Sequence, residues 1–228
     1  MSISKEELNK IRGFFCSELD SLCEEYPSFL QFLIFRTRNK FCDFCQLDEY
    51  EAEGWRDLEI ESGETKAVII FNDSDWILKI PFNMQANSNK TKGKYPDYCH
   101  IEEKNYQKAV ESGVEEFFAP IFRLDDYEFE DGCCSYSCPI YAMERIDVDE
   151  EENSSLGMSL SGEPEEDEYY EEPSSEELAV ACLENSWGVE RAIDLQDFLC
   201  DNDINDIHTG NIGVNSKGMY VICDYSGY

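Results

Sequence analysis

Two stretches near the end of the sequence decide the fold: Asp206-Ile-His-Thr-Gly-Asn-Ile-Gly213 and Met219-Tyr-Val-Ile-Cys-Asp-Tyr-Ser-Gly227. The first places Asp206 and Asn211 five residues apart in a tight loop. The second is an apolar strand that ends at Asp224, just before a turn of small residues. A short hairpin joins the two stretches. The region therefore offers two carboxylates and one amide that could carry chemistry.

Phosphoryl transfer requires this set of side chains. One carboxylate orients the attacking hydroxyl group and accepts its proton, while a lysine further upstream grips the phosphates. An amide oxygen and a second carboxylate can hold magnesium, which favours hard oxygen ligands and shares its shell with phosphate and water. Taken singly, these residues are a weak signal, because Asp and Asn are also common in ordinary turns.

Upstream of this region the sequence predicts an antiparallel sheet and a helix. Apolar residues at helical spacing indicate a helix over 98–112 that ends at Gly113, and a polar loop over 84–97 precedes it. Runs rich in β-branched and aromatic residues, bounded by turn residues, indicate strands. The expected strands cover 58–60, 67–71, 76–80, 117–124 and 138–146, and an acidic hairpin separates the last two.

The segments that flank these elements differ in character. Residues 4–36 predict two amphipathic helices packed on a core, with Ser4 before the first helix and Pro27 between the two. Residues 147–177 contain 14 acidic residues and no Lys or Arg. This composition predicts an extended, self-repelling insert that is disordered at least in part.

Net charge limits the partners of the protein. The chain has 51 Asp and Glu against 18 Lys and Arg, a formal charge of −33. A polyanion cannot neutralise phosphates along a duplex, so we expect no direct nucleic-acid binding and no adhesion to an anionic membrane. No apolar run reaches the ~20 residues of a spanning helix, and the start lacks a signal-peptide pattern, so a cytoplasmic protein is expected. Binding of a basic protein partner is still compatible with this charge.

In their order along the chain, these features resemble the protein-kinase-like fold. Lys79, in Trp76-Ile-Leu-Lys-Ile80, resembles the third-strand lysine that contacts the α- and β-phosphates of ATP. Glu102, or its neighbour Glu103, resembles the glutamate that pairs with this lysine. Glu102 is favoured because it lies one turn before Tyr106 on the same helix face.

The same resemblance implies an adenine site. Pro139-Ile-Tyr-Ala-Met-Glu-Arg-Ile146 resembles the fifth strand and the hinge of the family. By this analogy Met143 would gate the adenine pocket, and the backbone at Glu144 and Ile146 would bond the adenine.

The two opening stretches take the catalytic roles in this resemblance. It implies that Asp206 is the catalytic base and that the cofactors are ATP and magnesium, with Asn211 and Asp224 as the metal ligands. His208 stands where the family usually has a lysine. We interpret His208 as a structural or phosphate-side residue, because Asp206 already fills the role of the base.

The fold class implied by the resemblance is α+β and two-lobed. It would have a five-stranded antiparallel small-lobe sheet, a truncated helical large lobe and an N-terminal helical extension. The sequence ends four residues after Asp224, and in this it resembles the minimal kinases of bacterial effector and phage proteins. This resemblance leaves open whether the protein is delivered into a host cell. The expected divisions are an extension over 1–50, a small lobe and hinge over 57–146, the acidic insert over 147–177 and a reduced large lobe over 178–228.

Two functions and one structural alternative follow from the sequence. The first function is a minimal ATP-dependent kinase that transfers the γ-phosphate to a hydroxyl group of a protein Ser, Thr or Tyr. The second is a pseudokinase or acidic decoy that binds a basic partner or blocks a DNA-binding surface.

The 11 cysteines indicate mainly reduced thiols. However, Cys42-Asp-Phe-Cys45 and Cys133-Cys-Ser-Tyr-Ser-Cys138 leave a structural zinc site as an alternative.

Overall fold

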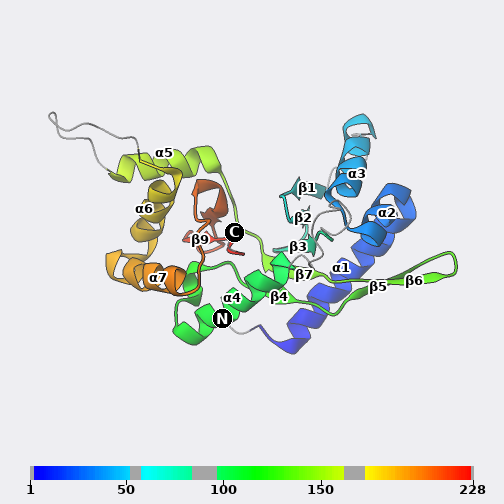
Figure 1. Cartoon of the computed structure of the whole chain (residues 1–228), viewed down its shortest axis with the longest axis horizontal. Helices are drawn as coiled ribbons and strands as arrows, with labels where there is room; N and C mark the ends of the chain where they lie inside the picture. The colour runs from blue at the N-terminus through cyan, green and yellow to red at the C-terminus, as the bar shows by residue number, and fades with distance from the viewer. Residues whose placement is uncertain (1–2, 52–57, 84–96, 162–172, 227–228) are drawn as a thin grey trace, which may run out of the picture. The chain divides into compact units, whose positions relative to one another are not determined.

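The computed structural model describes residues 3–51, 58–83, 97–161 and 173–226, which form two compact units (Figure 1). The first unit comprises Met1–Glu103 and Ile121–Met143, and the second comprises Lys104–Pro120 and Glu144–Tyr228. The N-terminal residues therefore belong to the same unit as the sheet, and most of the expected loop at 84–97 lies outside the described residues.

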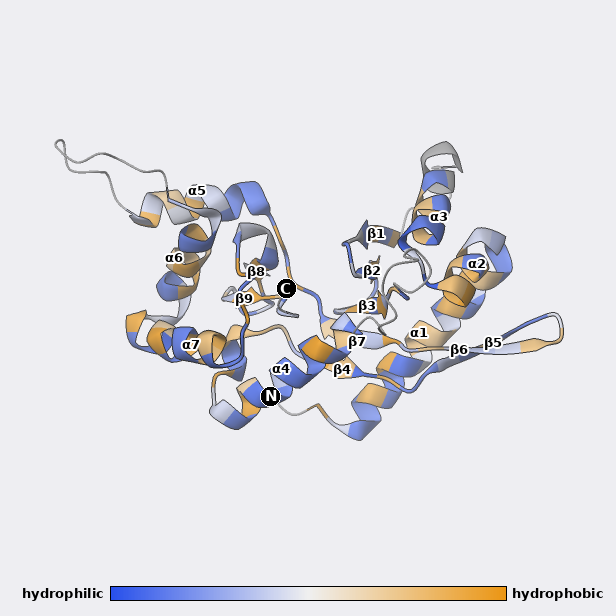
Figure 2. Ribbon diagram, viewed as in Figure 1, coloured by the Kyte–Doolittle hydropathy of each residue, from blue (hydrophilic) through white to orange (hydrophobic). Residues whose placement is uncertain are grey.

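Three helices open the first unit. They are α1 (Lys5–Glu25), α2 (Pro27–Phe35) and α3 (Arg38–Glu51). The side chain of Ser4 accepts a hydrogen bond from the backbone N–H of Glu7, which caps the first turn of α1. Proline suits the first position of a helix because the N–H that it lacks would have no partner there. The predicted helical pair over 4–36 is confirmed, and α1 carries both apolar and polar residues along its length (Figure 2).

The sheet of the first unit has five strands in the described part of the chain, in the order β1-β2-β3-β7-β4. The β1–β2, β2–β3 and β4–β7 pairs are antiparallel. The strands are β1 (Leu58–Ser62), β2 (Lys66–Phe71), β3 (Trp76–Pro81), β4 (Ile121–Arg123) and β7 (Tyr141–Glu144). The predicted five-stranded sheet and its first three strands are confirmed.

Two of the expected strands are shorter than predicted. The strand expected over 117–124 begins only at Ile121, because Glu115–Phe117 form the 3-10 turn η2. The strand expected over 138–146 is confined to Tyr141–Glu144. Cys138 instead ends β6 (Cys134–Cys138), which pairs only with β5 (Tyr127–Asp131) as the acidic hairpin.

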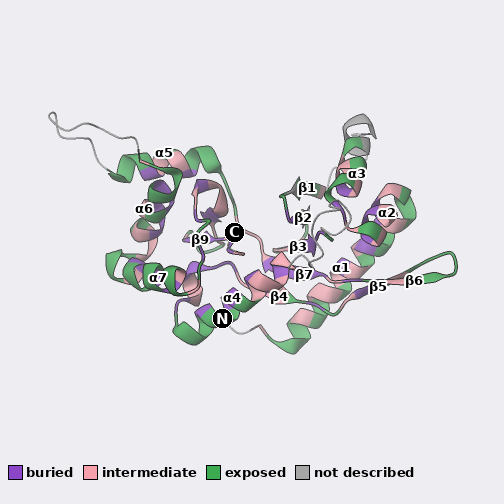
Figure 3. Cartoon of the chain, in the orientation of Figure 1, coloured by how far each residue is buried: buried purple, intermediate pink, exposed green. Residues whose placement is uncertain are grey.

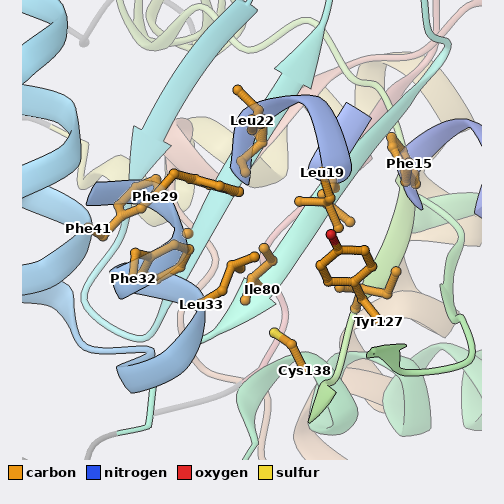
Figure 4. Packing of buried hydrophobic residues seen from close by; sticks show 14 of the residues in the cluster. Phe15, Leu19, Leu22, Phe29, Phe32, Leu33, Phe41, Ile80, Tyr127 and Cys138 are labelled. Atoms are coloured by element: carbon orange, nitrogen blue, oxygen red, sulfur yellow. The ribbon is translucent and has the colours of Figure 1, made fainter. Parts of the chain in front are cut away.

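The core of the first unit lies between the N-terminal helices and one face of the sheet (Figure 4). Successive residues of a strand point to opposite faces, and the β2 residues of this face pack with the helices. The Phe71 ring lies 5.8 Å from that of Phe15, and the Phe82 ring, just past β3, lies 6.1 Å from that of Phe32. The strand residues in this cluster are Ala67, Ile69, Phe71, Leu78 and Ile80. The other face of β2 carries Lys66, Val68 and Ile70.

Helix α4 (Tyr98–Ser112) is confirmed over its predicted length. It ends at Gly113, whose φ of +73° is a left-handed conformation that glycine adopts without steric cost. The helical spacing predicts one buried side that carries Ile101, Tyr106, Ala109 and Val110. Tyr106 and Ala109 are buried and Ile101 is partly buried, but the prediction is wrong for Val110, which is 46% exposed.

The second unit is built from helices and one short hairpin. The aromatic residues Phe118, Phe198 and Tyr225 meet in its core, and α6 and α7 are buried on one side and exposed on the other (Figure 3). Its helices are the part of α4 from Lys104 onward, α5 (Glu150–Ser161), α6 (Ser175–Trp187) and α7 (Val189–Asp201). The hairpin consists of β8 (Ile212–Val214) and β9 (Tyr220–Ile222), and the turn η3 (Thr209–Asn211) precedes it.

The prediction of an extended, partly disordered insert over 147–177 is wrong for its first part. Residues Glu150–Ser161 form α5, which packs on α6. A Cβ atom on Gly157 would lie 2.7 Å from the carbonyl oxygen of Leu178, so the two helices approach where the side chain is smallest. The acidic residues of α5 stand in its first turn, where they suit the helix dipole. At the other end of the expected insert, residues 175–177 form the first turn of α6, so the prediction is wrong there too. Residues 162–172 lie outside the described residues.

Among the described residues, no helix is both long and apolar enough to cross a membrane.

Candidate functional site

The first unit brings Lys79 of β3 and Glu102 of α4 together. The Lys79 ammonium group lies 3.2 Å from Oε2 and 3.3 Å from Oε1 of the Glu102 carboxylate. The Glu102 side chain is fully buried, and that of Lys79 is 4% exposed. The pair that the sequence resemblance implies is therefore a close ion pair from which water is excluded.

Glu103 takes a different position from Glu102, which settles which of the two neighbours meets the lysine. Glu103 Oε2 lies 3.1 Å from Nδ1 of His100, and its Oε1 accepts a hydrogen bond from the backbone N–H of Arg123. Adjacent residues on a helix point in directions about 100° apart. Only Glu102 therefore faces the lysine-bearing side of the sheet.

Lys66 is a third member of this cluster that the sequence analysis missed. Its ammonium group lies 2.6 Å from Glu102 Oε1, closer than that of Lys79. The strand phase gives a signal that could have found it. Lys66 follows the same two-residue period as Val68 and Ile70, which places its side chain on the face opposite the core.

The surroundings of Glu102 are dry. Cys99, one turn before it, is fully buried, and burial raises the pKa of its thiol well above the usual value, with the Glu102 charge adding to the effect. At neutral pH Cys99 is therefore an uncharged thiol. Nearby, the Tyr141 hydroxyl donates a hydrogen bond to Asp97 at 2.8 Å, and burial and that carboxylate raise the pKa of Tyr141.

The second unit holds Asp206 and Asn211 in one loop. The Asn211 Nδ2 donates a hydrogen bond of 2.7 Å to the backbone carbonyl of Asp206, which leaves the carboxylate of Asp206 outside this contact. That side chain is 53% exposed, and its Oδ1 lies 3.8 Å from Nε2 of His208. The Nδ1 of His208 accepts a hydrogen bond from the backbone N–H of Gly210, so His208 orders the turn.

Asn153 of α5 holds the backbone of this loop by hydrogen bonds. Its buried amide Nδ2 donates to the carbonyl oxygens of Thr209 at 2.9 Å and of Ile212 at 3.0 Å. These two carbonyls flank Gly210 and Asn211. The Ser175 hydroxyl accepts a hydrogen bond from the backbone N–H of Thr209. The sequence analysis did not find Asn153, because it lies in the segment that was expected to be extended.

Asp224 follows β9 and is tied to the same loop through the backbone. The Cys223 N–H donates to the carbonyl oxygen of Asn211 at 2.9 Å, and Ile212 pairs with Ile222 across the hairpin. Asp224 therefore comes one residue after a direct backbone link to Asn211. Its Oδ1 accepts a hydrogen bond from the Ser226 hydroxyl, and Gly227 of this motif lies outside the described residues.

The residues implied in adenine binding fall at the boundary between the two units. Met143 is buried in β7 opposite Ile121 and is the last residue of the first unit. Glu144 begins the next segment of the second unit, and its backbone N–H donates to the carbonyl of Pro120 at 2.9 Å. Ile146 follows two residues later and is partly buried.

Among the residues that the structure describes, no three or more His, Cys, Asp or Glu side chains form a group suited to a metal ion. The described cysteines therefore give the zinc alternative no support. A magnesium ion does not require such a cluster of protein side chains, and the oxygen atoms of Asn211 and Asp224 are of the kind that it binds. This ion is held by one or two carboxylates and completes its shell with phosphate and water. The amide of Asn211 donates through Nδ2, so a metal ion at this residue would be held by Oδ1.

Comparisons with known proteins do not establish a family for this chain. No family model matches the sequence, and no curated protein does. Among solved structures, the chain is similar to the bifunctional kinase-methyltransferase WbdD at 13% identity and a TM-score of 0.34. The match covers 72% of this chain and 30% of the length of WbdD. A score this low carries no argument for the fold or the function.

Proposed function

We propose that the protein is a minimal ATP-dependent kinase that transfers the γ-phosphate to a hydroxyl group of a protein Ser, Thr or Tyr. The observation that carries this proposal is the buried Lys79–Glu102 ion pair between a strand and the following helix. A buried ion pair contributes little net stability, because removing both charges from water costs as much as their attraction returns. A pair of this kind is better explained by the position in which it holds the ammonium group.

In this proposal the first unit grips the nucleotide. Phosphoryl transfer depends on positioning and on electrostatic stabilisation of the phosphates, and a lysine held by a glutamate supplies both. Glu102 fixes the end of the Lys79 side chain through both carboxylate oxygens. This removes the rotamer freedom that a free lysine would lose on binding the phosphates.

The second unit supplies the groups for the transfer step. Asp206 projects from a loop whose backbone is held by Asn153, Ser175 and Asn211. Its exposed carboxylate orients the acceptor hydroxyl and takes its proton. Asn211 and Asp224 would hold magnesium, which neutralises charge on the phosphates when bound.

The chain's charge favours a second candidate function. The 51 acidic residues against 18 basic ones suit a protein that sequesters a basic partner without catalysis. This candidate and the kinase differ in salt dependence. A complex held by exposed charges weakens steeply as salt rises, whereas a nucleotide held by buried groups responds less.

ATP binding tests the proposed function. Calorimetry of the native protein with ATP and magnesium should show binding that Lys79→Met weakens by about 10-fold or more, the value of a charge-assisted hydrogen bond. Asp224→Asn should also weaken this binding, because it removes a carboxylate from the proposed magnesium site. Lys40→Met, on an exposed lysine of α3, is the matched control and should bind like the native protein. Failure of the native protein to bind ATP would refute the proposal.

Phosphate transfer tests the role of Asp206. Arrays of Ser, Thr and Tyr peptides incubated with labelled ATP should be phosphorylated by the native protein. Asp206→Asn should lose this activity while it binds ATP normally, since its side chain is exposed and contributes little to the fold. Asp201→Asn, at the exposed end of α7, is the control. A variant Asp206→Asn that transfers phosphate at the native rate would remove Asp206 from the mechanism.

A further inference from the structure

Two lysines from adjacent strands share one buried carboxylate. Lys66 Nζ lies 2.6 Å and Lys79 Nζ 3.3 Å from the same Oε1 of Glu102. The side chains of both lysines are 4% exposed, and that of Glu102 is fully buried.

Strand register explains why the two lysines converge. Lys79 pairs with Val68, and Lys66 pairs with Pro81, so the lysines are diagonal neighbours on antiparallel strands. Directly paired residues point to the same face, and so do residues two apart along a strand. Both lysines therefore leave the sheet on the face of Glu102, away from the apolar core.

Two buried lysines at one point are costly to the fold. Each ammonium group loses its hydration, and the attraction within a buried ion pair seldom returns more than this cost. The chain has only 18 Lys and Arg among 228 residues, yet two of them are buried on one carboxylate. Two ammonium groups within reach of one oxygen form a geometry that a phosphate oxygen would also satisfy.

We propose that Lys66 is a second phosphate-binding residue and that Lys66 and Lys79 form a two-lysine site for the oligophosphate of a nucleotide. The proposal deepens the proposed function, since the ligand is the phosphate chain of the same ATP. Glu102 holds both ammonium groups in place, and the phosphate oxygens lie against the two lysines. Affinity then rises with the number of phosphates, from AMP through ADP to ATP, and inorganic tripolyphosphate competes with ATP.

Single substitutions suit this site, because each leaves one lysine in contact with Glu102. Lys66→Met retains the Lys79–Glu102 contacts, and Lys79→Met retains the 2.6 Å contact between Lys66 and Glu102. Methionine has a similar length and fills the same space with apolar atoms. Lys66→Arg keeps the charge and serves as the second variant at this position. Thermal unfolding without ligand verifies that each variant is folded.

The experiment measures calorimetric binding of tripolyphosphate, AMP, ADP and ATP to the native protein and these variants, with Lys40→Met as the control. Lys66→Met should weaken binding of tripolyphosphate and ATP by about 10- to 100-fold, with a much smaller effect on AMP. Lys66→Arg should recover most of the lost affinity. Lys40→Met should match the native protein for every ligand.

The outcomes separate this inference from the proposed function. If Lys79→Met loses ATP binding and Lys66→Met binds like the native protein, the two-lysine site is refuted and the kinase proposal stands. If both lysines are needed for tripolyphosphate binding but no peptide is phosphorylated, the anion site stands and the kinase proposal fails. Binding of neither ligand by the native protein refutes both.

Discussion

The candidate sites of the two units are positioned by opposite means. In the first unit, the charged side chains of Lys66, Lys79 and Glu102 are themselves buried in the fold. In the second unit, the Asp206 side chain is 53% exposed, and buried residues such as Asn153 hold only the backbone beneath it. A site of the first kind links function to stability, whereas a site of the second kind allows the two to change separately.

The largest effect is expected at Glu102, because this carboxylate is buried together with both lysines of the first unit. Glu102→Gln keeps the size of the side chain but removes the charge that both buried ammonium groups contact. Breaking a buried ion pair from one side costs about 3–5 kcal/mol. Urea denaturation measures this loss in the free energy of unfolding.

Two variants serve as controls for Glu102. Glu103→Gln changes the adjacent, less buried glutamate and should cost clearly less, and Asp206→Asn should stay within about 0.5 kcal/mol of the native protein. Equal stability of Glu102→Gln and the native protein would mean that the lysine cluster is not part of the folded core.

Substitution of Asn153 is expected to give the next largest effect, and it tests whether a buried side chain holds the loop that carries Asp206. Asn153→Ala removes the donor of two hydrogen bonds and leaves the buried carbonyls of Thr209 and Ile212 without it. The expected loss is about 2 kcal/mol, from the cost of unpaired buried polar groups. Hydrogen exchange should also speed up in the loop over 206–212.

The control for this variant lies in the same turn of α5. Glu152→Ala alters an exposed side chain and should leave both stability and loop exchange unchanged. If Asn153→Ala accelerates exchange no more than Glu152→Ala, the loop is held by other contacts and the supporting role of Asn153 is wrong.

The smallest effect is expected at the start of α6, where a charge is exposed. The backbone N–H and the hydroxyl of Ser174 hydrogen bond to Glu177, and these bonds lower its pKa below the usual value. A lowered folded-state pKa adds stability above the unfolded-state value of about 4.3, and this gain is lost as the pH falls through the folded-state pKa.

The melting temperature measures this effect as a function of pH. The melting temperature of the native protein should exceed that of Glu177→Gln at pH 7. The difference between the two melting temperatures should become smaller as the pH falls below about 4. Glu176→Gln, the exposed neighbour in the same turn, is the control and should show no such narrowing. A gap that stays constant to low pH would show that the capping box acts through packing alone.

Local patterns predicted most of the elements that carry the candidate residues. The helical spacing and cap at Ser4 placed α1, the turn residues between apolar runs placed β1–β3, and Gly113 marked the end of α4. These signals reflect interactions between residues up to about four apart, which composition and spacing report directly. The choice of Glu102 over Glu103 rested on the same periodicity.

Long-range contacts decided what the local patterns could not. Lys66 meets Glu102 across 36 residues, and Asn153 meets Thr209 across 56. The charge of residues 147–177 favoured an extended chain, yet α5 forms because its own buried side, including Asn153 and Gly157, packs on α6 and the loop. Packing outweighed the composition of the segment.

Composition and local spacing established which residues can carry charge and chemistry and on which helix, strand or loop each one stands. Which of these residues meet depends on strand register and helix packing, because these bring together side chains that no local spacing relates. The sharing of Glu102 by two lysines follows from the pairing of β2 with β3 and from the packing of α4.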